Sequence, residues 1–114
     1  MSNKTDKKAQ VKGLLDALLL FREYSPDITL ATVLTFLEVS KGDGVSGRDI
    51  EKALDTNSAS AARMLRYFDK IKTGTNEGLD MLDVRIDPHD YRSKTRYLNK
   101  KGEVLLDKVL ANLK

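Results

Sequence analysis

With 114 residues, of which 40% are hydrophobic and 32% charged, the chain can bury one modest core but not two independent ones. The absence of cysteine excludes disulfides and thiolate metal sites, and it fits a reducing compartment, so we expect a cytoplasmic protein. The net charge of +3 is unevenly distributed, because residues 85–101 are strongly basic whereas residues 13–45 and 73–84 are acidic. Such segregation allows a modest net charge to present one basic face.

A first helix is predicted over about residues 5–24, and Ser25-Pro26 ends it because proline disfavours a helical conformation in the residue before it. Apolar residues recur in it at spacings of three and four: Val11, Leu14, Leu15, Leu18, Leu19 and Phe21. This face is wide for a helix that packs on one side of a small domain. It either meets a second subunit or packs on the chain's own core. No run is long enough to span a bilayer, so no membrane contact is expected.

Two shorter helices follow. Thr29 is a candidate N-cap for the first, which ends before Gly42-Asp43-Gly44 and has its apolar stripe at Leu30, Val33, Leu34 and Leu37. Val45 can add a short strand. Ser46-Gly47-Arg48-Asp49 has the form of a capping box, which begins a helix with a buried stripe at Ile50, Ala53 and Leu54. This helix would be the first half of a helix-turn-helix.

A fourth helix is predicted over about residues 57–72, with Asn57 or Ser58 as its cap and an apolar stripe at Ala61, Met64, Leu65, Phe68 and Ile71. Its other side is small or basic: Ser58, Ala59, Ser60, Ala62, Arg63 and Arg66. Small side chains would let the helix approach a major groove, and arginines can bond phosphates or guanine edges. In isolation, an ordinary solvated face would be favoured. The position between a helix-turn and a basic hairpin favours nucleic-acid binding.

Residues 84–102 predict two strands around a charged turn, followed by the start of a helix. Val84, Ile86 and Tyr97 favour strands, whereas Asp87-Pro88 interrupts them. Six cations crowd this segment against only Asp87 and Asp90: Arg85, Arg92, Lys94, Arg96, Lys100 and Lys101. A basic hairpin beside a helical pair indicates a phosphate-bearing partner. The final helix has an apolar stripe at Val104, Leu105, Val109 and Leu110.

Catalytic chemistry is not expected. The single histidine, His89, lies in the hairpin turn among charged residues rather than beside a candidate nucleophile. Gly42-Asp43-Gly44 lacks the strand-then-helix context of a phosphate loop, and no residues have metal-ligand spacing. We therefore expect a protein that is not an enzyme and that uses no cofactor and no metal.

Residues 29–102 resemble the MarR family of winged-helix transcriptional regulators. The densest match to that family's wing and following helix is Asp87-Pro88-His89-Asp90-Tyr91-Arg92-Ser93-Lys94, followed by Tyr97-Leu98-Asn99-Lys100-Lys101-Gly102. The resemblance implies that Asp90 orients Arg92 and that Arg92 enters the minor groove. Residues 49–63 are similar to the family's helix-turn-helix. Thr56 replaces an apolar turn residue, residues 72–79 are extra, and the C-terminal region is shorter than is usual in the family.

Pattern and resemblance together predict a mostly α, α+β fold in one domain spanning residues 1–114. A winged helix-turn-helix at 29–98 would be flanked by an N-terminal tail and helix at 1–25 and a C-terminal helix at 99–114. A homodimer held by the first and last helices is expected, although the two helices could instead pack on each other within one subunit.

The function implied is a DNA-binding transcriptional regulator, with the helix at about 57–72 in the major groove of double-stranded DNA and the wing at about 81–98 in the minor groove. The expected DNA-binding residues are Ser58, Ser60, Ala62, Arg63, Arg66, Arg85, Asp90, Arg92, Lys94 and Arg96. The alternative is a winged-helix accessory protein that binds DNA with little sequence preference or binds another protein.

Overall fold

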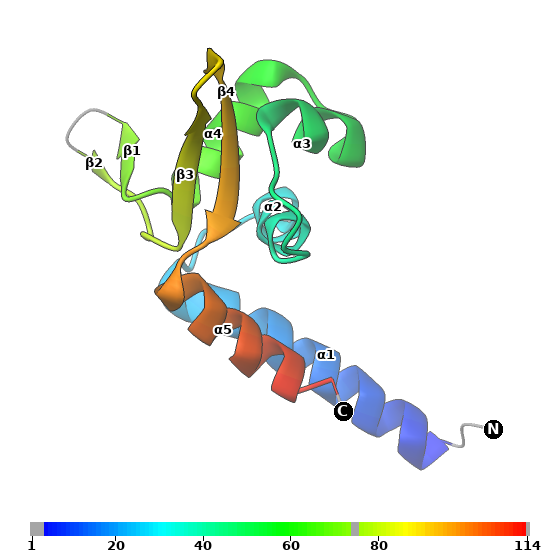
Figure 1. Cartoon of the computed structure of the whole chain (residues 1–114). Coiled ribbons are helices and arrows are strands. Elements are labelled where there is room, and N and C mark those ends of the chain that lie inside the picture. Colours follow the sequence, from blue (N-terminus) through cyan, green and yellow to red (C-terminus); the bar gives the residue numbers. More distant parts are fainter. Residues whose placement is uncertain (1–3, 74–75, 114) are drawn as a thin grey trace. The chain divides into compact units, whose positions relative to one another are not determined.

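The computed structural model describes the backbone of residues 4–73 and 76–113 and, within these, the side chains of residues 6–70, 77–86, 88–90 and 94–113. The described chain contains five helices and two small antiparallel sheets (Figure 1). It divides into two compact units: a terminal unit of Met1–Ile28 with Val104–Lys114, and a central unit of Thr29–Glu103. Each unit is described by itself. The expected single domain over residues 1–114 stays a prediction.

Three capped helices begin the central unit: α2 (Leu30–Val39), α3 (Gly47–Leu54) and α4 (Ser58–Phe68). The Thr29 hydroxyl accepts the first-turn N–H of Thr32 at 3.2 Å. Ser46 and Asp49 form a reciprocal capping box at the start of α3. The Asn57 side chain accepts the N–H of Ser60 at 2.8 Å and so caps α4. These caps, which satisfy backbone donors that have no partner inside the helix, confirm the predicted helix starts.

The predicted end of α4 is wrong, because the helix stops at Phe68 and not near residue 72. Asp69 adopts an extended conformation, and the returning chain supplies N–H donors to the last carbonyls of the helix and to those just after it. These bonds run from Gly78 to Lys70, from Leu79 to Tyr67, from Asp80 to Asp69 and from Met81 to Phe68. Gly78 allows this close approach, since a Cβ there would collide with the Asp69 carbonyl.

Residues 72–79, which are extra relative to the family, overlap a small hairpin in which β1 (Ile71–Thr73) pairs with β2 (Asn76–Glu77). Ile71 therefore lies in a strand rather than in the helical stripe where its spacing placed it. Periodicity alone could not find this boundary, because the bonds that terminate α4 come from a segment that returns to the helix from further along the chain.

The predicted wing is confirmed as the hairpin of β3 (Leu82–Asp87) and β4 (Asp90–Leu98), joined by Pro88 and His89. The pairing is regular from Leu82↔Leu98 to Ile86↔Lys94, then shifts so that Asp87 pairs with Asp90 and residues 91–93 form a bulge. Val45, predicted as a short strand, forms a bridge to Arg96 with N···O distances of 3.0 and 2.8 Å. β4 therefore lies between β3 and Val45.

The core of the central unit combines all three helices with the base of the wing. Phe36 of α2 and Phe68 of α4 place their ring centroids 5.4 Å apart with the rings tilted by 50°. Around them are buried the side chains of Val33, Val39, Val45, Ile50, Ala61, Leu65, Met81 and Leu82. The predicted α2 stripe is wrong except for Val33, because the inner side of this helix is formed by Thr32, Val33, Thr35, Phe36 and Val39, while Leu30 and Leu34 are exposed. This core fixes the relative positions of α3, α4 and the wing, whose exposed sides form the candidate site.

The terminal unit consists of α1 (Lys4–Tyr24) and most of α5 (Lys100–Ala111), which lie alongside each other (Figure 1). Gly13 allows their close approach, because a Cβ there would collide with the Asn112 carbonyl. Only part of the predicted stripes is buried, namely Phe21, Leu105 and Val109 together with Ala17. The rest is exposed: Val11, Leu14, Leu15, Leu18, Leu19, Val104 and Leu110. In the part of the chain that is described, no helix is both long enough and apolar enough to cross a membrane.

Candidate nucleic-acid interface

The exposed face of α4 carries the small and basic residues that the sequence singled out. Ala61, Met64, Leu65 and Phe68 are buried and define the inner side of the helix. At 100° per residue, the opposite side is centred on Ala59, Arg63 and Arg66, which are all exposed. Ser58 is exposed at the start of the helix, while Ser60 and Ala62 are half-buried at the edges of this exposed side. The structure thus leaves Ser58, Arg63 and Arg66 exposed and places Ser60 and Ala62 at the two edges of this face.

The small residues lie in the first turn and a half of α4 and the arginines lie further on. The Arg63 guanidinium donates to the Ser60 hydroxyl at 3.4 Å, so its position is biased along the helix rather than fully free. A helix with this arrangement can bring its N-terminal backbone close to a partner while its longer cations reach outward. That combination suits a polyanion with a groove.

The basic residues of the wing are divided between its two faces, a division that was not predicted from the sequence. Side chains alternate along a strand, so the observed register places Lys94 and Arg96 on one face and Arg85 on the other. The Arg85 guanidinium lies 4.1 Å from the centroid of the Tyr97 ring, a cation–π contact that holds it against the outer face. Lys94 is exposed on the inner face, on the side of α3 and α4.

Arg96 differs from the other predicted DNA-binding residues because it is only 8% exposed. Its Nε donates to Asp69 Oδ1 at 3.1 Å and its Nη2 donates to Asp69 Oδ2 at 2.8 Å. The register opposite Val84 turns the side chain inward, and the end of α4 supplies the carboxylate that meets it. We therefore correct the expectation for Arg96, which is engaged inside the unit, and identify Asp69 as a residue that sequence reasoning missed.

Two predicted wing-tip residues are placed less completely. Asp90 begins β4 and is exposed, with its side chain at the groove described below. Arg92 belongs to the backbone of β4, but its side chain lies outside the described residues. The expectations that Asp90 orients Arg92 and that Arg92 enters the minor groove stay predictions.

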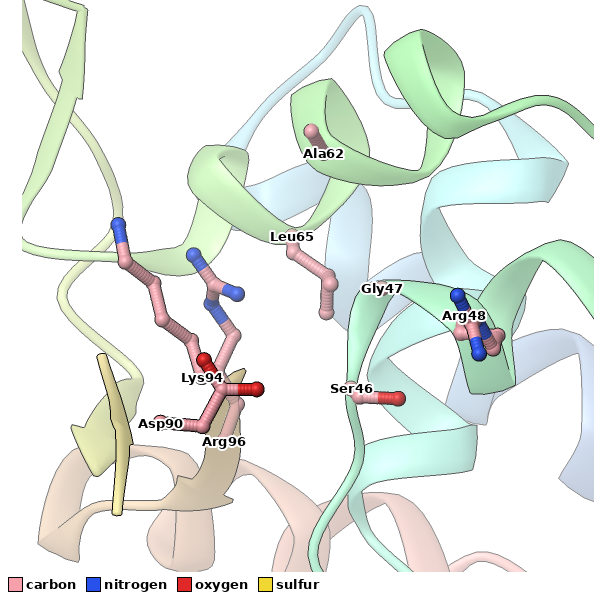
Figure 2. Close-up of a pocket in the computed structure, with 8 residues that line it drawn as sticks. All are labelled: Ser46, Gly47, Arg48, Ala62, Leu65, Asp90, Lys94 and Arg96. Atoms are coloured by element: carbon pink, nitrogen blue, oxygen red, sulfur yellow. The ribbon is translucent and has the colours of Figure 1, made fainter. Parts of the chain in front are cut away.

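An open groove of about 740 Å³ lies between the start of α3, α4 and the wing. Figure 2 shows Asp90, Lys94 and Arg96 on one side, Ser46, Gly47 and Arg48 on another, and Ala62 and Leu65 of α4 between them. Arg48 is exposed and lines the same space, although the sequence pattern marks it only as part of the capping box. Two exposed cations, Arg48 and Lys94, and one exposed carboxylate, Asp90, therefore border a groove whose helical wall is formed by Ala62 and Leu65.

On the other edge of α4, Ser60 and Arg63 line a second open groove of about 480 Å³, together with Tyr67 and residues of α2 and the α3–α4 turn. Among the residues whose side chains are described, no group of three or more histidine, cysteine, aspartate or glutamate side chains could hold a metal ion. His89 is exposed in the wing turn. The site is therefore described by its shape and its cations.

Comparison with family sequence models found no match, and comparison with the sequences of curated proteins found none either. Solved structures do match. A mutant of MepR from a multidrug-resistant clinical isolate of S. aureus matches with a TM-score of 0.66, 21% identity and coverage of 84% of this chain and 63% of that chain. S. aureus MepR in complex with DNA matches with a TM-score of 0.62, 20% identity and coverage of 93% and 73% respectively.

The transcriptional regulator Tm0710 from Thermotoga maritima matches with a TM-score of 0.71, 15% identity and coverage of 94% of this chain and 68% of that chain. The chain thus spans about two thirds to three quarters of the length of these proteins. At such identities the likeness concerns the fold. The chain has the MarR-like winged-helix fold, mostly helical with a small antiparallel wing, that its sequence predicted.

Proposed function

We propose that this protein is a transcriptional regulator that binds double-stranded DNA, with α4 in the major groove and the β3–β4 wing in the adjacent minor groove. The observation that carries the proposal is the open groove whose borders bear Arg48 and Lys94 and whose helical wall presents Ala62. Arg63 and Arg66 add two exposed cations to α4 outside this groove. A spaced set of cations can contact several backbone phosphates of a duplex. Each such contact is favourable because it releases condensed counterions.

The structural match to a MepR–DNA complex supports this proposal, since that protein holds DNA with the same fold. The proposed contacts comprise Ser58, Ser60, Ala62, Arg63 and Arg66 on α4 and Arg85, Asp90, Arg92 and Lys94 on the wing, to which we add Arg48. The small residues of α4 would approach base edges, and Arg48 and Lys94 would bind the strand that runs between helix and wing. Arg96 is left out because its guanidinium is committed to Asp69.

We further propose that the regulator is a homodimer held by the terminal unit. Leu14 and Leu15 are 53% and 54% exposed, and they lie in a continuous stripe with Val11, Leu18 and Leu19 on α1. Such contiguous exposed apolar surface marks an interaction site. A second copy is the simplest partner, because a pseudo-palindromic DNA site is read by two copies of a recognition helix related by two-fold symmetry.

Selection from random-sequence duplex, followed by salt titration of the binding constant, tests the proposal. A regulator should recover a pseudo-palindrome, with the logarithm of the binding constant falling linearly with the logarithm of salt concentration. Binding without a preferred sequence would instead identify a DNA accessory protein. No duplex binding at low salt would point to the protein-binding alternative.

A further inference from the structure

The ion pair between Asp69 and Arg96 joins the two elements that the proposed function requires to act together. Asp69 directly follows the last residue of α4, and Arg96 lies in β4 of the wing. The pair is bidentate, with N···O distances of 3.1 and 2.8 Å, and the two side chains are only 12% and 10% exposed. It is thus a buried contact between the proposed recognition helix and the wing.

The backbones of both residues connect further elements. The N–H and the carbonyl of Arg96 both bond to Val45, the residue directly before the capping box of α3. The Asp69 carbonyl accepts the N–H of Asp80 in the segment that leads into β3. A single side-chain contact therefore closes a ring through α4, the returning segment, β3 and β4, with the start of α3 attached to it.

The Asp69–Arg96 pair is not needed merely to fill the buried space between α4 and the wing. The same inner face of the wing carries Leu82 and Leu98, so an apolar side chain at position 96 would pack against apolar neighbours. Replacing a buried ion pair with well-packed apolar residues is often neutral or stabilising, because the charges no longer have to be desolvated. What the pair adds is direction, since a guanidinium fork on a carboxylate fixes both distance and orientation, whereas apolar contact is non-directional.

We propose that Asp69 and Arg96 are positioning residues that hold the wing at one angle to α4, so that Lys94 and the cations of α4 can engage a single duplex at the same time. Neither residue touches DNA. The part of this inference that concerns DNA rests on the proposed function, whereas the geometric part concerns the free protein alone.

The test replaces the ion pair with an apolar pair, Asp69→Leu with Arg96→Met. The matched control makes a closely similar chemical change at the surface pair Glu38–Lys41, whose N···O distance is 3.1 Å: Glu38→Leu with Lys41→Met. Because the chain contains no cysteine, spin labels can be attached at Ala59→Cys on α4 and Ile86→Cys on the wing, both exposed positions. Pulsed electron paramagnetic resonance then measures the interspin distance without DNA.

We expect one narrow distance distribution for the parent protein and for the control, and a broadened or shifted one for the apolar pair, with the circular dichroism spectrum retained. If the apolar pair does not fold, Arg96→Lys, which keeps the charge but removes the fork, takes its place with the same expectation. An unchanged distribution in the folded variant overturns the inference, whatever the protein does with DNA.

The unlabelled proteins are then titrated with the selected duplex. The apolar pair should bind about tenfold more weakly, as expected when the wing no longer engages the duplex. Lys94→Ala should lower the salt slope by roughly one in the parent protein and have no effect in the apolar-pair background. A purely structural role for the ion pair would leave the Lys94 effect unchanged, and that result would overturn the DNA part of the inference. If the parent protein binds no duplex, the proposed function fails while the distance measurement still decides the positioning role.

Discussion

The aromatic and aliphatic core of the central unit and the apolar stripe of α1 differ in how much of their surface is buried. In the central unit, Phe36, Ile50, Leu65 and Phe68 are completely buried. In the terminal unit, α1 has an equally regular apolar stripe, but its members are between 38% and 64% exposed from Val11 to Leu19. Apolar surface left in water forgoes roughly 25 cal/mol per Å², so the α1 stripe retains a driving force for association. The central unit also leaves Leu30, Leu34, Val84 and Ile86 exposed, so the contrast concerns its core. Periodicity therefore identifies an apolar face but not what covers it.

The largest expected effect is a loss of stability at a buried position of the central core, compared with an exposed position of α1. Phe68→Ala should lower the free energy of unfolding by about 3–5 kcal/mol, because it removes a fully buried ring that packs on Phe36. Leu14→Ala, at an exposed position of α1, should change the stability of the monomer by less than about 0.5 kcal/mol. Urea unfolding at low protein concentration measures both. Equal changes in the two variants would erase the contrast between the two units.

The second effect concerns association. Leu15→Glu with Leu19→Glu should convert a dimer into a folded monomer, because two charges would be placed in the proposed interface. Duplex affinity should fall roughly 100-fold, because the second half-site would no longer be tethered to the first. Light scattering gives the mass, and circular dichroism gives the fold. Ala9→Glu, at an exposed position nearer the start of the same helix, serves as the control and should leave the dimer intact.

A parent protein that is already monomeric at micromolar concentration would rule out the proposed dimer. So would a variant that unfolds instead of dissociating, since the stripe would then belong to the chain's own core. Either result would mean that the exposed stripe of α1 does not form a dimer interface.

The next prediction concerns the contribution of the wing to DNA binding, for comparison with that of α4. Arg92→Ala should weaken duplex binding by about 1–3 kcal/mol without affecting the melting temperature, if Arg92 enters the minor groove as the resemblance implies. Fluorescence anisotropy with the selected duplex measures the change. Lys52→Ala removes an exposed cation of α3 and provides the charge-matched control. The same affinity for Arg92→Ala and the parent protein would remove the wing tip from the interface.

The smallest expected effect concerns the binding of phosphates by α4. Arg63→Gln with Arg66→Gln should lower the magnitude of the salt slope by about two, since each phosphate that is no longer neutralised lowers it by roughly 0.9. Lys41→Gln with Lys52→Gln removes the same charge from exposed positions that line neither of the two grooves beside α4, and it should leave the slope unchanged. If both pairs change the slope equally, the effect reflects net charge, and α4 would have no special role compared with the rest of the unit.

Much of the central unit could be predicted because its signals are local. Thr29, Ser46 and Asn57 cap helices through bonds to residues three positions away, so the sequence shows both partners. The wing follows from β-favouring residues on both sides of Pro88. The end of α4 and the role of the Asp69 carboxylate could not be found in this way. They depend on residues 78–81 and on Arg96, which meet the end of the helix only after the chain has folded back.

The sequence by itself determined the helix starts, the hairpin and the small and basic face of α4, because these depend on neighbours along the chain and on the side-chain periods of helix and strand. The winged-helix fold followed from these patterns only together with the family resemblance. Only the tertiary structure decided what each cation does. Arg85, Lys94 and Arg96 look alike in the sequence, yet strand register turns the first onto Tyr97, the second into the groove and the third onto the Asp69 carboxylate. A one-residue step along a strand reverses the direction of a side chain, which separates Arg85 from the other two. Lys94 and Arg96 share a face and differ because only Arg96 lies where the end of α4 packs on the wing.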